Sequence, residues 1–328
     1  MNVLIIGSGS IGTRHLKNTL QLYPECKITL VSRSRKSIDF DRVEVVSTVL
    51  EACRLNQLFD AAIVATPTSL HVENTIELIQ LGIKKIYVEK PISHNLESID
   101  TLISVAKENH VQVFVGFDMR FDPGLNKVKE LLSSKTIGDL VSVQAEVGQY
   151  LPDWRPDTNY KEGMSAKVAL GGGVMLDLIH EFDYLTWLLG PYKRIVGFHK
   201  TIAALDIETE GISVNLFESE SGVLGQLSLD YIQKNLSRKS KFIGEFGNIE
   251  WNYVTSEVKW KTREETNWNH FHYADFDRND RFLEIFKAFY IATESNIDSR
   301  LTSLEDSLIS LKAVLNAKAS DKLIQNYS

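Results

Sequence analysis

The sequence has few of the residues that staple a small secreted domain or anchor a chain in a membrane. Its 328 residues include only two cysteines, Cys26 and Cys53. Two cysteines make neither a disulfide framework nor a metal-ligand pattern, and their scarcity is typical of a reducing cytoplasm. No apolar run approaches the roughly 20 residues that span a bilayer. These absences predict a cytoplasmic protein with no metal site and no membrane contact.

The sequence also has no excess of positively charged residues. The 36 lysines and arginines are outnumbered by 43 aspartates and glutamates, which gives a formal net charge of −7. A negative surface repels nucleic acid and anionic lipid, so neither is expected as a partner. The apolar start, MNVLIIGSGSIG, lacks the basic region and the cleavage site of a signal peptide, and we interpret it as a strand.

The first 120 residues alternate short apolar runs with helical patterns. Strands are expected at 3–6, 27–32, 61–66, 85–90 and 111–117, with helices at 12–22, 48–56, 70–82 and 97–110. Such alternation predicts βαβ units and an α/β domain with a doubly wound parallel sheet. The strands are nearly continuous apolar runs, as expected when helices cover both faces.

The remaining residues have a different texture. The segments 140–147, 209–217 and 223–231 alternate apolar and polar residues, which is typical of strands with one buried face. The other expected elements are a hairpin around Gly247-Asn248, a long helix at 172–189 and closing helices at about 279–294 and 302–324. We predict two domains, 1–120 and 121–328, and the second is an α+β domain with an open, largely antiparallel sheet.

A glycine-rich turn, Gly7-Ser8-Gly9-Ser10-Ile11-Gly12, follows the first strand and precedes a helix. In that context G-x-G-x-x-G indicates a Rossmann dinucleotide site, and an ordinary βα turn is the alternative. Gly7 permits the tight turn, Gly9 lets the backbone approach the pyrophosphate, and Gly12 allows helix and strand to pack closely. The helix N-terminus, with Ser10 and Ile11, then offers N–H groups to the phosphates.

The end of the second strand indicates which dinucleotide binds. About 20 residues beyond the glycines, an NAD site carries a carboxylate for the ribose 2′-OH. Here the chain has Ser32 and Arg33, with Arg35 and Lys36 close by. A serine and a guanidinium suit a 2′-phosphate, which favours NADP over NAD. A solvated basic loop is the alternative.

Two later strands should end at the same edge of the sheet. The motif ATPTSLH ends one of them, so Thr66 and Pro67 are expected to lie by the cofactor, and His71 either touches it or holds a structural partner. The motif VEKPIS ends the next and brings Glu89 and Lys90 toward the nicotinamide. The alternative is a simple ion pair at a strand end, which is worth little by itself.

The motifs GSGSIGTRH, ATPTSLH and VEKPIS, in this order and spacing, resemble the glucose–fructose oxidoreductase / inositol dehydrogenase / MocA family. The resemblance continues through VGFDMRFDP, IGDLVSVQAE, LGGGVMLDLIHEFDYLTWLLG and TSLEDSLISLKAVLNAKAS. Asp118 stands where the family usually has asparagine. The resemblance implies an NAD(P)-dependent dehydrogenase of a sugar, polyol, sugar acid or sugar nucleotide. It also implies a homodimer or homotetramer that associates through the second sheet.

The helix at 172–189 carries titratable residues. At about 100° per residue, Asp177, His180, Glu181 and Tyr184 share one face, for which a solvated stripe is the ordinary explanation. The resemblance implies that Lys90, Asp177 and His180 line the substrate site, although D-x-x-H replaces the usual D-x-x-x-H. We expect Lys90 to hold the reacting oxygen and His180 to move the proton. Lys90 as the base is the alternative.

The segment 149–173 has little periodicity and is expected to lie over the site. Arg155 suits a carboxylate or phosphate and Tyr160 suits a sugar face, so both are predicted substrate contacts. A structural flap or subunit contact is the alternative. Two other functions stay open: nicotinamide-assisted elimination without net redox, and a sensor that binds NADP(H) without catalysis. The joint presence of Lys90, Asp177 and His180 disfavours the sensor.

Overall fold

The computed structural model describes residues 1–33, 40–55 and 58–320. Within these ranges the chain forms two compact units. Unit 1 consists of Met1–Asp118 and Arg278–Leu308, and unit 2 consists of Met119–Asp277 and the chain from Ile309 onward. The chain first passes from unit 1 to unit 2 between Asp118 and Met119, close to the domain boundary predicted at 120/121. The return of Arg278–Leu308 to unit 1 differs from the prediction, which assigned all of 121–328 to the second domain.

Unit 1 is built on a seven-stranded sheet with the order β15-β6-β5-β4-β1-β2-β3. The strands are β1 (Asn2–Ile6), β2 (Lys27–Val31), β3 (Val43–Val46), β4 (Ala61–Val64), β5 (Lys85–Val88), β6 (Gln112–Val115) and β15 (Thr302–Ser303). All pairs are parallel except that of β15 with β6. The predicted doubly wound parallel sheet is confirmed, with its order reversing between β1 and β4. Strands β3 and β15 were not predicted. Strand β3 is only partly buried and β15 has only two residues, so neither forms a recognisable apolar run.

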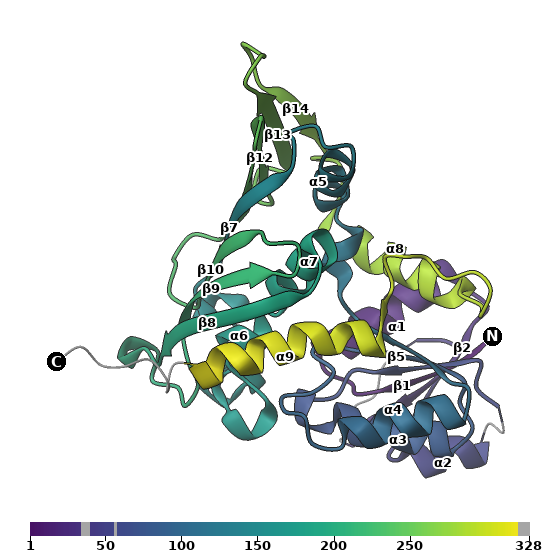
Figure 1. Cartoon of the computed structure of the whole chain (residues 1–328). Coiled ribbons are helices and arrows are strands. Elements are labelled where there is room, and N and C mark those ends of the chain that lie inside the picture. Colours follow the sequence, from purple (N-terminus) through teal and green to yellow (C-terminus); the bar gives the residue numbers. More distant parts are fainter. Residues whose placement is uncertain (34–39, 56–57, 321–328) are drawn as a thin grey trace. The chain divides into compact units, whose positions relative to one another are not determined.

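Helices cover both faces of this sheet. They are α1 (Ser10–Leu22), α2 (Val49–Leu55), α3 (His71–Gln80), α4 (Ile99–Glu108) and α8 (Arg278–Ile291). Figure 1 shows α1 and α8 on one face and α3 and α4 on the other. The ring of Tyr87 lies 5.0 Å from that of Phe286 and 5.6 Å from that of Phe289, between ring centroids. These buried phenylalanines explain why α8 belongs to unit 1, since the core under α1 is incomplete without them.

Unit 2 contains an eight-stranded sheet with the order β14-β13-β12-β11-β7-β10-β9-β8. The strands are β7 (Leu140–Gly148), β8 (Tyr192–Lys200), β9 (Ile212–Ser219), β10 (Leu224–Asp230), β11 (Ser237–Gly244), β12 (Gly247–Asn252), β13 (Glu257–Thr262) and β14 (Asn269–His272). Only β7 and β10 pair in parallel, so the predicted largely antiparallel sheet is confirmed. The predicted hairpin is confirmed as β11 and β12, but its turn lies at 245–246, because Gly247 and Asn248 already belong to β12 and pair with β13 and β11.

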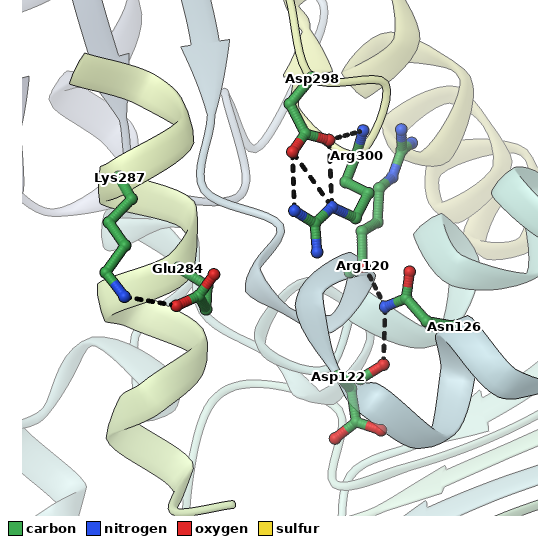
Figure 2. A network of polar contacts seen from close by, with 7 residues as sticks. All are labelled: Arg120, Asp122, Asn126, Glu284, Lys287, Asp298 and Arg300. Atoms are coloured by element: carbon green, nitrogen blue, oxygen red, sulfur yellow. Dashed lines mark hydrogen bonds and ion pairs between the residues drawn. The ribbon is translucent and has the colours of Figure 1, made fainter. Parts of the chain in front are cut away.

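The helices of unit 2 are α5 (Pro123–Ser133), α6 (Val174–Asp177) and α7 (His180–Leu189), and α9 (Leu304–Ser320) begins in unit 1 and continues into unit 2 from Ile309. The carboxylate of Asp122 caps α5 by accepting the N–H groups of Gly124 and Leu125 at 3.0 and 3.2 Å. In Figure 2 the Asn126 amide donates to the main-chain carbonyls of Arg120 and Asp122 and secures the same turn. The last predicted residues of the closing helix, 321–324, lie outside the described residues.

The single helix predicted at 172–189 was wrong, since α6 and α7 are separate. Leu178 has φ −100° and ψ 28°, which ends α6. Contacts elsewhere in unit 2 hold α7 in place. Arg120 grips Asp183 through two hydrogen bonds, of 2.9 and 2.7 Å, and both residues are buried. Within the described ranges, no helix has the length and hydrophobicity needed to cross a bilayer.

Candidate functional site

The carboxyl edge of the parallel sheet brings the predicted motifs side by side. The hydrogen-bond ladder continues one residue past each strand. The Ala65 N–H donates to the Ile6 carbonyl at 2.8 Å, and the Glu89 N–H donates to the Val64 carbonyl at 2.9 Å. The glycine turn, the ATPTSLH motif and the EKP motif therefore begin on one edge, where doubly wound sheets bind their ligands.

The three fingerprint glycines are needed for different reasons. Gly7 has φ +108°, and a Cβ on it would collide with the Ala65 carbonyl. A Cβ on Gly12 would collide with the carbonyl of Gly7, so this glycine allows α1 to approach β1. Nothing lies within 4 Å of the place where a Cβ on Gly9 would stand. The fold does not require Gly9, and the open space beside it at the start of α1 fits a phosphate.

The residues predicted to read the ribose lie at the end of β2. The hydroxyl groups of Ser8 and Ser32 are 2.7 Å apart, so Ser32 joins the glycine turn to β2. Ser32 is buried and Arg33 is exposed directly after it. Arg35 and Lys36 lie outside the described residues. Ser10 is exposed and Ile11 half-buried at the first turn of α1.

His71 links the two segments that follow β4 and β5. Its Nδ1 lies 2.7 Å from the Pro91 carbonyl and its Nε2 lies 2.9 Å from the Thr66 carbonyl. Burial lowers the pKa of His71, and the two carbonyl acceptors only partly oppose that shift. The structural partner that the sequence analysis allowed for His71 is therefore present. The Thr66 hydroxyl donates to Asn74 at 3.0 Å, and Pro67 is exposed beside it.

Glu89 and Lys90 have different surroundings, since Glu89 is buried and Lys90 is half-buried. The Glu89 carboxylate lies 2.6 Å from Nε2 of His15 on α1, and both residues are buried. Burial raises the pKa of the neighbouring Tyr87 well above its ordinary value, and the charge of Glu89 adds to this. Lys90 is half-buried and joined to Pro91 by a cis peptide bond. The carbonyl of Pro91 is the one that His71 contacts, so the strand end next to Lys90 is fixed.

In unit 2, Asp177 ends α6 and His180 begins α7. The Tyr231 hydroxyl donates to Oδ2 of Asp177 at 2.6 Å, which fixes the direction of the carboxylate. Burial raises the pKa of Tyr231 well above its ordinary value, and the charge of Asp177 raises it further. Tyr231 therefore keeps its proton and acts as the hydrogen-bond donor to Asp177. His180 is half-buried.

The other polar residues of α7 anchor the helix. Nε of Arg238 lies 2.8 Å from the buried Glu181 carboxylate, and Tyr184 shares a hydrogen bond of 2.8 Å with Ser240. These contacts argue against the solvated stripe that the helical wheel alone would suggest.

The segment 149–173 consists largely of short 3-10 turns. Arg155 is exposed, and the Tyr160 hydroxyl donates to the Leu205 carbonyl at 3.0 Å. Lys161 pairs with Asp206 at 2.7 Å and ties the segment to its neighbour. These contacts hold part of the segment against residues 205 and 206, and substrate contact by Arg155 and Tyr160 stays a prediction.

Comparison with known proteins gives the family. The family model described as "Oxidoreductase family, NAD-binding Rossmann fold" matches residues 1–117, and "GFO/IDH/MocA C-terminal domain" matches residues 125–250. The chain belongs to the GFO/IDH/MocA oxidoreductase family. The resemblance inferred from the motifs is therefore confirmed.

Individual members of the family align over much of the chain. Myo-inositol 2-dehydrogenase of Thermotoga maritima is 29% identical, with 69% of this chain and 67% of that protein covered. The NADP-dependent scyllo-inositol 2-dehydrogenase IolW of Bacillus subtilis is 30% identical over 58% of this chain and 51% of its own length. Such alignments span about half to two thirds of the curated relatives. A structure of levoglucosan dehydrogenase with NADH and levoglucosan has a TM-score of 0.83 at 16% identity, covering 98% of this chain and 97% of the other, and shows a shared fold.

In this GFO/IDH/MocA protein, the structure groups the predicted residues by unit. Gly7, Gly9, Gly12, Ser32, Arg33, Thr66, Pro67, His71, Glu89 and Lys90 belong to unit 1, whereas Arg155, Tyr160, Asp177 and His180 belong to unit 2. Sequence reasoning missed Ser8, His15 and Tyr231. His15 ends the motif GSGSIGTRH, but neither it nor Tyr231 received a role from the sequence, because their partners Glu89 and Asp177 are distant in sequence.

The glycine geometry predicts that two valine substitutions act differently. Gly9→Val points into open space from extended backbone, so stability should be unchanged while dinucleotide affinity falls about tenfold or more. Gly12→Val forces α1 from β1 and should cost about 1–3 kcal/mol in the free energy of unfolding. Urea denaturation and NAD(P)H fluorescence titration measure the two effects. Unchanged dinucleotide binding by the Gly9 variant would contradict the assignment.

Proposed function

We propose that this protein is an NAD(P)-dependent dehydrogenase or reductase. It would transfer a hydride between nicotinamide and a CH–OH carbon of a sugar, polyol, sugar acid or sugar nucleotide. One observation carries the proposal. At the carboxyl edge of the unit 1 sheet, there is open space beside Gly9 at the start of α1, and the same edge bears Lys90. The inositol and levoglucosan dehydrogenases among the related proteins support the substrate class.

When bound, nicotinamide accepts or returns the hydride. We assign to Lys90 the binding of the oxygen on the reacting carbon, and to His180 the transfer of the hydroxyl proton. Asp177 would contact a neighbouring hydroxyl. The hydrogen bond from Tyr231 supports this role because it orients the carboxylate. Lys90 as the base in place of His180 is the other assignment of roles.

Removing either proposed proton-handling group should slow the chemical step. Lys90→Met and His180→Gln are each expected to lower kcat by about 10²–10⁴-fold and to leave cofactor affinity within about twofold. Lys107→Met, at an exposed position on α4, serves as the control and should keep full turnover. Near-normal turnover of the Lys90 variant would overturn the scheme.

The substrate for these measurements comes from a screen of sugars, polyols, sugar acids and sugar nucleotides with both cofactors. A stoichiometric change in the absorbance of the reduced nicotinamide supports net hydride transfer. Substrate conversion without that change would instead indicate nicotinamide-assisted elimination. Tight cofactor binding with no turnover on any substrate class would indicate a sensor.

The proposed cofactor preference is NADP over NAD. The support is the exposed Arg33 directly after the buried Ser32, with no carboxylate at either position. Arg33→Ala should weaken NADPH binding about tenfold or more and leave NADH binding unchanged, since only NADPH carries the 2′-phosphate. Arg54→Ala, at another exposed position of unit 1, is the control. Equal or tighter binding of NADH by the unmodified protein would remove Arg33 from this role.

We also propose self-association through the sheet of unit 2. Strand β9 turns Ser213 and Asn215 inward and leaves Val214 and Leu216 exposed by 40% and 57%. Val196 and Phe198 of β8 pair with these residues and are exposed by 46% and 59%. An apolar cluster of this kind on the outer face of a sheet is typical of a surface that another subunit covers.

Charged substitutions at this cluster should separate the subunits. The unmodified protein is expected to have the mass of a dimer or tetramer by light scattering, and Phe198→Asp combined with Leu216→Asp should give the monomer mass. Phe246→Asp, at a 61% exposed site outside the cluster, should have no effect on mass. A monomeric unmodified protein would contradict the proposal.

A further inference from the structure

The edge hairpin of the unit 2 sheet carries a cluster of metal-ligating side chains. His270 and His272 are two residues apart on β14, so both side chains point to the same face. Glu257 is the first residue of β13 and lies directly opposite His272 in the antiparallel register. The three side chains therefore converge from two neighbouring strands.

The ligand atoms lie close together. Oε1 of Glu257 is 2.7 Å from Nδ1 of His270 and 3.6 Å from Nε2 of His272. The two imidazole rings stack with centroids 5.8 Å apart and an angle of 9° between their planes. One donor atom from each residue lies within 4.8 Å of the other two, an arrangement of metal-ligating side chains found at one place in the described ranges.

The two separations between the carboxylate and the imidazoles lie within about 0.6 Å of what one zinc ion requires. Zinc binds imidazole nitrogen and carboxylate oxygen at about 2.0–2.2 Å in tetrahedral geometry, which places two donor atoms about 3.3 Å apart. The distance of 3.6 Å is close to that value, and the distance of 2.7 Å needs to open by about 0.6 Å. The histidines are 45% and 64% exposed, so small rotations of the rings are available to them.

The positive charge of the neighbouring Lys259 is partly compensated. Lys259 is two residues from Glu257 on the same strand face and stands opposite His270. Its Nζ lies 2.9 Å from Oε2 of Glu250 and 4.9 Å from the centroid of the Trp268 ring, so its charge is partly compensated. An exposed histidine–glutamate ion pair, the ordinary explanation of the cluster, is worth about 0–1 kcal/mol. It gives no reason for a second histidine on the same carboxylate.

We propose that Glu257, His270 and His272 form a binding site for one divalent transition-metal ion of the zinc type. Two imidazoles and a carboxylate make a ligand set that zinc uses in proteins, with water at the fourth position. Mg²⁺ and Ca²⁺ prefer oxygen ligands and would not compete. The bound ion would clip β14, a four-residue edge strand, to its neighbour β13. The site shares no residue with the proposed catalytic set.

The test is calorimetric titration of the chelator-treated full-length protein with ZnCl₂. The expected result is one saturable binding event that EDTA reverses and that MgCl₂ does not reproduce. His272→Ala and Glu257→Gln should each weaken the event about 10–100-fold or more, since loss of even an outer partner of a metal ligand costs that much. His110→Asn, an exposed histidine in unit 1, should leave it unchanged.

Thermal unfolding supplies a second readout. Zn²⁺ should raise the melting temperature of the unmodified protein, because an ion that binds only the folded chain stabilises it. It should not raise that of the His270→Ala, His272→Ala double variant. The metal-free variants should melt as the unmodified protein does, since both histidines are well exposed. Absence of Zn²⁺ binding, or equal binding by the double variant, would overturn the proposal.

Discussion

The candidate site depends on the hydrogen-bond register of the parallel sheet in unit 1. Parallel strands all end in the same direction, so the chain leaves β1, β4 and β5 at one edge. The ladder runs one residue further, through Ala65 and Glu89, before the backbone turns away. Gly7 can begin its turn there because it reaches a positive φ, and a side chain on it would strike the neighbouring strand end. This constraint places the glycine turn on the same edge of the sheet as the strand end that carries Lys90, with β4 between them.

Buried polar partners then hold the surrounding segments in place. His71 contacts the main chain after β4 and after β5, and Glu89 is held by His15 on α1. In unit 2, Tyr231 holds Asp177, while Arg120 fixes α7 through Asp183. A buried polar group without its partner is costly, so each of these contacts favours one arrangement of the backbone. The proposed catalytic side chains therefore stand beside rigid neighbours within their own units.

The two sheets differ in how their faces are covered, and this difference bears on function. Helices lie on both faces of the parallel sheet (Figure 1). The sheet of unit 2 instead exposes valine, leucine and phenylalanine on β8 and β9, and two histidines on β14. One part of this face suits a protein surface and the other suits a small cation.

The sequence by itself determined the doubly wound sheet, the glycine fingerprint, the strand ends that hold the candidate site residues, and the family. Each of these rests on hydrophobic period or on a short motif, which neighbouring residues along the chain specify. Only the tertiary structure decided the break between α6 and α7, the return of α8 to unit 1, and the pairs Glu89–His15 and Asp177–Tyr231. It also brought Glu257 to His270 and His272. Their physical cause is contact between residues far apart in sequence, which local pattern does not encode.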